Sequence, residues 1–235
     1  MTVLHLADEG EAADLAAFLS RLLHYDRSAA VRLQAAGTAL AVFGRPPSFE
    51  VLAVRTVRLA KPYENGLDVT LDVTVSAGEL LESVDERAAT ARVPGSVTGP
   101  PWAGMLPPRG GWRAEPGLPA PDALRALVAA AVAEFRARTE ELAAEDRTRA
   151  VLDGIGRDIW SRTVGDTGLP VRAVHAAQSL GFLRPRGASG PGTGPGSGED
   201  APRLFSSGAW LRLRTPFGSV ALRRAGTGAL GISVR

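Results

Sequence analysis

The sequence contains no cysteine, a single lysine (Lys61) and only three histidines. Without cysteine the chain can form neither disulfides nor a thiolate metal site, and the thiol chemistry of redox enzymes is excluded. His5, His24 and His175 are widely separated and none has a second ligand at metal spacing, so we expect no metal ion and no other cofactor. No apolar run approaches the roughly 18 residues of a membrane span, and the first residues show no basic region followed by an apolar core, the pattern of a signal peptide. We therefore expect a cytoplasmic protein without a membrane partner.

Of the 27 basic residues, all but Lys61 are arginine, and alanine, glycine and proline are abundant. This composition is typical of a GC-rich genome, of the kind found in actinobacteria. An apolar content of 45 % in 235 residues is sufficient for a substantial core. We expect two compact parts joined by a linker.

Charge is distributed unevenly between these parts. The segment 147–235 holds 13 arginines and five acidic residues, a net charge of +8, whereas 1–146 carries a net of −6. A cluster of positive charge raises the local concentration of polyanions, which indicates nucleic acid as a partner. The same asymmetry is compatible with a protein partner, self-association or attraction between the two parts.

The first part, residues 1–92, has the pattern of an α+β domain. Apolar residues recur at helical spacing within 12–24, behind acidic residues that favour a helix N-terminus. Extended runs follow at 30–36, 38–44, 49–59 and 66–75. Ser76 and Glu79 have the spacing of a capping box and open a further short helix. The pattern predicts a small antiparallel sheet with a helix packed on one face.

Residues 93–120 form a linker or strap rich in proline, glycine and tryptophan. Seven prolines and six glycines fall between Pro94 and Pro119, which excludes a helix there. Trp102 and Trp112 belong to this segment, and we expect their rings to be buried against a flanking part. The alternative is an exposed aromatic ligand for a partner.

Residues 121–235 form the second predicted part, which begins with helical periodicity over about forty residues. The pattern predicts two helices, or one long helix that bends near Gly154 and Gly156. A turn at 165–168 is followed by a helix from Pro170 to about Leu183, with proline in the first turn. One side of this helix is apolar, and the other carries polar side chains of the kind that contact bases or phosphates.

The sequence after this helix predicts a basic β-hairpin, with strands at 210–214 and 219–224. Leu211 and Leu213 alternate with Arg212 and Arg214, so one side is apolar and the other cationic. The order of these elements, a helix, a turn, a second helix and a basic ribbon, resembles that of a winged-helix DNA-binding domain. The flexible low-complexity loop 187–200 departs from that pattern. The candidate nucleic-acid-binding residues are Arg172, His175, Gln178, Ser179, Arg212, Arg214, Arg223 and Arg224.

No readable motif places a nucleophile beside a base, and the glycine pair Gly154 and Gly156 lacks the other elements of a phosphate-binding loop. The sequence therefore favours a non-enzymatic, nucleic-acid-associated protein, such as a DNA-binding regulator with a helix-turn-helix. The alternative is a protein–protein adaptor or scaffold with no nucleic-acid role. Salt-sensitive DNA binding would favour the first class, and salt-sensitive self-association without DNA binding the second.

Overall fold

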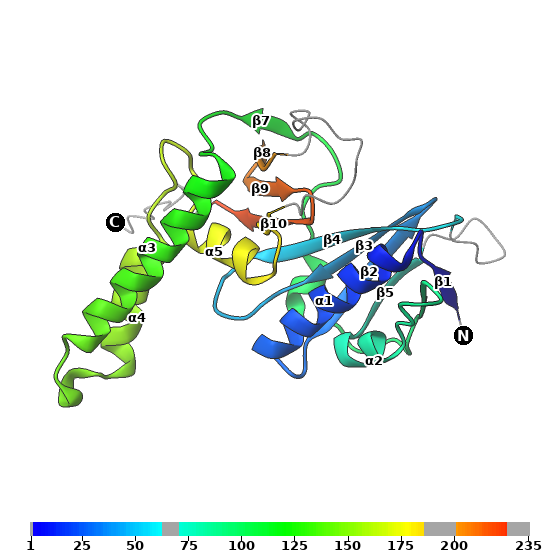
Figure 1. Cartoon of the computed structure of the whole chain (residues 1–235), viewed down its shortest axis with the longest axis horizontal. Helices are drawn as coiled ribbons and strands as arrows, with labels where there is room; N and C mark the ends of the chain where they lie inside the picture. The colour runs from blue at the N-terminus through cyan, green and yellow to red at the C-terminus, as the bar shows by residue number, and fades with distance from the viewer. Residues whose placement is uncertain (1, 63–70, 186–200, 225–235) are drawn as a thin grey trace, which may run out of the picture.

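The computed structural model describes residues 2–62, 71–185 and 201–224, and shows an α+β fold built on a large antiparallel sheet (Figure 1). The helices are α1 (Glu9–Tyr25), α2 (Ala77–Glu82), α3 (Pro121–Glu140), α4 (Arg149–Trp160) and α5 (Val171–Ser179), with short 3-10 helices at Pro101–Gly104 and Ala144–Asp146. The strands of the large sheet, in spatial order, are β5 (Leu71–Ser76), β2 (Ala30–Ala36), β3 (Ala39–Gly44), β4 (Leu52–Arg58), β10 (Gly218–Arg223), β9 (Trp210–Thr215), β8 (Arg203–Ser207) and β7 (Arg113–Glu115). A separate pair is formed by β1 (Val3–His5) and β6 (Thr90–Arg92).

The two halves of the sheet repeat one arrangement. In the N-terminal half α1 is followed by the antiparallel meander β2–β3–β4, and in the C-terminal half α5 is followed by β8–β9–β10. The third strands of the two meanders, β4 and β10, pair antiparallel at the centre, with Val54 opposite Ser219. The sheet is therefore continuous through both halves.

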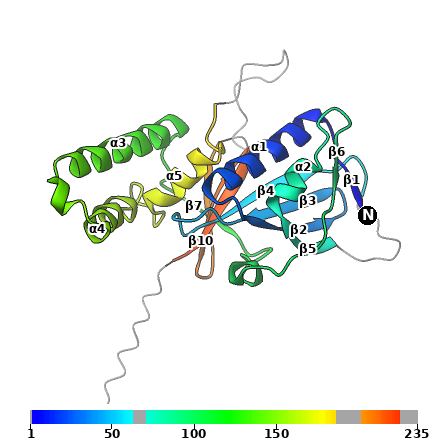
Figure 2. The same cartoon turned by 90° about the horizontal axis from the view of Figure 1, so that it is seen from below.

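Helices α1 and α5 cover one face of this sheet, while α3 and α4 extend side by side away from it (Figure 2). The side chain of Asp8 caps α1 by accepting a hydrogen bond from the backbone N–H of Glu11 at 2.8 Å. Leu15, Phe18 and Leu19 of α1 are almost completely buried, and burial of each is worth about 1.5–3 kcal/mol. Phe18 also stacks on Phe182, with ring centroids 5.7 Å apart, and so joins the two halves.

A buried arginine makes a second connection between the halves. Arg55, only 6 % exposed, donates from Nη2 to Glu11 Oε2 at 3.0 Å and to Asp14 Oδ2 at 3.1 Å. Its Nη1 donates to the backbone carbonyl of Phe217 at 2.9 Å. Arg184 binds the other oxygen of Asp14 at 2.5 Å. Part of the acidic charge of the first part is thus neutralised within the molecule.

The sequence predictions for the first part are largely confirmed. The first helix and the strands at 30–36, 38–44 and 49–59 are present as α1, β2, β3 and β4, and the predicted strand 66–75 is present as β5 from Leu71 onward. The earlier positions of that strand lie outside the described residues. Ser76 caps α2 by accepting a hydrogen bond from the N–H of Glu79 at 3.3 Å, as expected.

The helical predictions for the second part need two corrections. Of the two alternatives, two helices are confirmed as α3 and α4. The single long helix with a bend near Gly154 and Gly156 is wrong, because α4 continues through both glycines. The chain breaks earlier, between Glu140 and Arg149, where the hydroxyl of Thr148 caps α4. The predicted helix from Pro170 to Leu183 ends at Ser179, since Gly181 takes a left-handed conformation (φ 76°).

The winged-helix pattern is not confirmed. Both strands of the predicted hairpin exist as β9 and β10, but β8 lies beside β9 and β4 beside β10. The hairpin is therefore an interior part of the eight-stranded sheet and does not project as a wing. Strands β7 and β8 are absent from the sequence prediction. The predicted loop 187–200 lies outside the described residues.

Candidate nucleic-acid interface

The face of the sheet opposite α1 and α5 carries the charged side chains of the C-terminal strands. On β9, Leu211 and Leu213 are buried on the helical side, which confirms the predicted alternation. Arg212 and Arg214 therefore lie on the open face. The register places Arg203 of β8 opposite Arg214, so three arginines from adjacent strands lie on one surface.

No acidic residue occurs anywhere between Arg203 and Arg223 in the sequence. Arg212 is half-buried, donates from Nε to Ser219 Oγ at 3.0 Å and lies 5.7 Å from the ring of Trp112. Burial, and secondarily the positive charge of Arg214, lower the pKa of Arg212. An anion bound here would offset the effects of burial and of the neighbouring positive charge, because it restores a favourable environment for the charged guanidinium.

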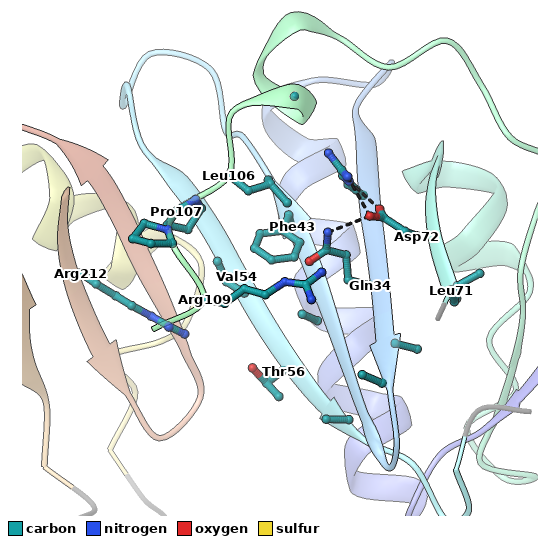
Figure 3. Close-up of a pocket in the computed structure, with 17 residues that line it drawn as sticks. Gln34, Phe43, Val54, Thr56, Leu71, Asp72, Leu106, Pro107, Arg109 and Arg212 are labelled. Atoms are coloured by element: carbon teal, nitrogen blue, oxygen red, sulfur yellow. Dashed lines mark hydrogen bonds and ion pairs between the residues drawn. The ribbon is translucent and has the colours of Figure 1, made fainter. Parts of the chain in front are cut away.

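A hollow of about 580 Å³ lies beside Arg212 on the open face (Figure 3). Arg109, from the segment after the 3-10 helix, and Arg212 both line it. On its far side Asp72 accepts hydrogen bonds from Arg32 Nε at 2.7 Å and from Gln34 at 3.0 Å. These contacts, chiefly that with Arg32, lower the pKa of Asp72. The carboxylate therefore offsets the charge of Arg32 and leaves the side nearer Arg212 cationic.

The predicted strap passes over this face. Trp102 and Leu106 pack against an apolar cluster of Phe43, Leu52 and Val54. Trp112 is half-buried, and its Nε1 donates to the backbone carbonyl of Pro108 at 3.0 Å. The strap thus covers part of the sheet and adds two indole rings to its surface.

The candidate residues of α5 lie elsewhere and are mostly occupied by contacts within the protein. His175 stacks on Trp160 at 4.6 Å and meets the edge of Phe49 at 5.2 Å, and burial lowers its pKa. Arg172 lies 3.5 Å from a carboxylate oxygen of Glu50. Ser179 is half-buried and Gln178 is exposed. Helix α4 and the segment around Phe49 therefore pack against much of the surface that a recognition helix would present.

The structure separates the eight sequence candidates into two groups. Arg212, Arg214 and Arg223 share the open face, and Arg224 reaches Glu115 at 3.5 Å. The four α5 residues come from a helix packed on the opposite face. Sequence reasoning missed Arg203, although it alternates with buried residues along β8 as Arg212 does along β9.

No helix in the described parts of the chain is both long and apolar enough to cross a membrane. Within the same described ranges, no group of three or more histidine and acidic side chains is arranged to hold a metal ion.

The geometry defines an α+β protein with one helix-covered and one open sheet face. By sequence the chain belongs to the family described as Domain of unknown function (DUF8185), whose model matches residues 107–227. A second model, Domain of unknown function (DUF8010), matches residues 1–104. The junction of the two ranges falls within the segment 93–120. No curated protein matches the sequence.

Among solved structures, the chain is similar to the DNA polymerase sliding clamp from Pseudomonas aeruginosa, at 12 % sequence identity and a TM-score of 0.49. The match covers 94 % of this chain and 64 % of the clamp chain, so this chain spans less than two thirds of that structure. A likeness of this degree supports no statement about what this chain binds.

Proposed function

We propose that this protein binds nucleic acid through the open face of its sheet, with phosphates contacting a basic surface made of Arg109, Arg203, Arg212 and Arg214. The observation that carries the proposal is the in-register placement of Arg203 opposite Arg214, with Arg212 two residues along the same strand. Guanidinium groups bind phosphate oxygens with two parallel hydrogen bonds, so such a row can follow a phosphate backbone.

Aromatic rings among these arginines support the same proposal. Phe205 lies opposite Arg212 in the register, and Trp112 lies 5.7 Å from the Arg212 guanidinium. Both rings are half-buried, so each retains an exposed portion. Bases that leave the duplex stack on such rings, which is worth about 1–3 kcal/mol per base. The sheet face thus offers contacts to both backbone and bases, whereas α5 is largely packed.

The test is binding of the full chain to a labelled mixed-sequence duplex and to the matching single strand, measured by fluorescence anisotropy over a series of salt concentrations. The variant carries Arg203→Gln, Arg212→Gln and Arg214→Gln. A control with the same charge change carries Arg136→Gln, Arg149→Gln and Arg157→Gln, which are exposed positions on α3 and α4.

We expect the wild type to bind more weakly as salt rises. Loss of three phosphate contacts should reduce the slope of log affinity against log salt by about 2.7 for the duplex and about 2.1 for the single strand. The control should keep the wild-type slope. Equal effects of the two triple variants, or no binding of either probe at low salt, would overturn the proposal. Salt-sensitive self-association without nucleic-acid binding would instead indicate the adaptor class.

A further inference from the structure

A second hollow, of about 390 Å³, lies where the two halves of the sheet meet. It is formed where β4 begins and β10 ends, next to the first turn of α5 and the strap. Hollows at the junction of two structural units are frequent binding sites, and this volume lies within the range of small-molecule pockets.

The floor and walls of this hollow are apolar and aromatic. Leu52 and Leu222, both nearly buried, belong to the two central strands. Trp102 from the strap and Trp210 from β9 contribute half-buried indole rings. Met105, which is 57 % exposed, also lines the hollow. Two indoles over an aliphatic floor suit a planar aromatic ring, which gains both apolar burial and stacking.

The remaining charged lining is predominantly cationic. Arg45, Arg172 and Arg223 come from three separate segments, and Glu50 is the one acidic residue in the lining of this hollow among the described residues. The buried Nε of Arg172 makes no hydrogen bond to any described residue and lies 3.5 Å from Glu50. A net charge of +2 matches a phosphate dianion better than a single carboxylate, and a buried guanidinium N–H retains a hydrogen bond to donate.

The backbone beside the hollow is strained. Ser48 and Glu50 both have positive φ angles, 71° and 54°, although neither is glycine. Left-handed backbone at such residues is energetically unfavourable and is concentrated at binding sites. Here the conformation places Glu50 next to Arg172 in the hollow.

We propose that this hollow binds a free mononucleotide, with the base against the indoles of Trp102 and Trp210 and the phosphate at Arg172 and Arg223. The base accounts for the apolar and aromatic lining, and the phosphate for the surplus of guanidinium groups. The site is distinct from the basic surface proposed above for nucleic-acid strands, and it does not depend on that proposal.

The experiment is isothermal titration of the full chain with AMP and UMP, compared with adenosine and with inorganic phosphate. We expect both nucleotides to bind more tightly than adenosine or phosphate alone, since each of these fills only part of the site. A 5′-phosphorylated oligonucleotide, compared with its unphosphorylated form, identifies the alternative source of the same chemistry. Binding of the phosphorylated strand end without binding of AMP or UMP would overturn the proposal.

Two matched pairs of variants locate the site. Arg223→Gln should weaken AMP binding about tenfold or more, as expected for a lost charge-assisted hydrogen bond. Arg224→Gln, at the next residue and outside the lining, should change it less than about twofold. Trp102→Leu should abolish the quenching of tryptophan fluorescence by AMP, whereas Trp112→Leu, in the same strap, should preserve it. Circular dichroism verifies folding of each variant.

The proposal is refuted if neither nucleotide binds at millimolar concentration, if inorganic phosphate binds as tightly as AMP, or if Arg223→Gln and Arg224→Gln behave alike. The variant Arg203→Gln, Arg212→Gln, Arg214→Gln separates the two proposals, because it should lose strand binding and retain AMP binding. Trp102→Leu should show the opposite pattern.

Discussion

Replacing Arg55 with methionine should destabilise the fold by about 3 kcal/mol, the lower end of the cost of breaking a buried ion pair. The lower end applies because Glu11 and Asp14 each keep a second partner, Arg58 at 2.9 Å and Arg184 at 2.5 Å. Such a loss corresponds to a decrease in melting temperature of about 6–12 °C for a chain of this size. Urea denaturation followed by circular dichroism measures the change in the free energy of unfolding.

The matched control is Arg58→Met, on the same strand and also paired with Glu11. The Arg58 side chain is 69 % exposed, so solvent screens its ion pairs and its loss should destabilise the fold much less than loss of Arg55. A double-mutant cycle between Arg55→Met and Glu11→Gln should give a coupling free energy of about 1.5 kcal/mol or more. If Arg55→Met costs no more than Arg58→Met, or if the cycle shows no coupling, the argument that this arginine joins the halves is wrong.

Three further perturbations test other features of the structure. Gly218→Ala should destabilise by about 1–3 kcal/mol, because the new Cβ would lie 2.5 Å from the ring of Phe182. Gly37→Ala, in open space with φ 57°, should cost only the backbone strain of about 1 kcal/mol; thermal unfolding compares the two. Burial lowers the pKa of His175 below its ordinary value of 6.5, so the unfolded chain takes up this proton first as the pH falls. The free energy of unfolding should then decrease from pH 7 to pH 5, and less steeply in His175→Phe, which denaturation at each pH measures. Asp72→Asn removes a carboxylate from the open face and should strengthen nucleic-acid binding at low salt, measured by anisotropy.

Each of these expectations has an opposing result. Equal destabilisation by the two glycine substitutions would contradict the packing of Phe182 against Gly218. An unchanged pH dependence in His175→Phe would show that other groups govern stability in that range. Weaker binding by Asp72→Asn would contradict the expectation that this carboxylate opposes phosphate binding on the open face.

Local periodicity was sufficient to predict most of the N-terminal half. Alternation along the run 49–59 places Arg55 on the same side as Val51, Ala53 and Val57, which are buried in the structure. The spacing of Ser76 and Glu79 alone predicts the cap of α2. Both signals act within a few residues of the chain, so they need no knowledge of tertiary contacts.

The central pairing of β4 with β10 could not be predicted in the same way, because strand partners distant in sequence leave no local pattern. Without that pairing the sequence predicts a projecting ribbon. The same limit applies to the basic surface. Arg212 and Arg214 lie in a strand with a clear sequence pattern, whereas Arg203 belongs to a short strand that the sequence does not predict. The hollow at the junction combines residues from five segments, none of which indicates a site alone.

The central strand pair also has a consequence for how the chain reaches its native state. The contact between Arg55 and Phe217 joins positions 162 residues apart. During synthesis one row of backbone hydrogen-bonding groups of β4 therefore stays unpaired until the chain has been made as far as β10. Successful folding thus depends on protecting that exposed edge from other chains until β10 arrives.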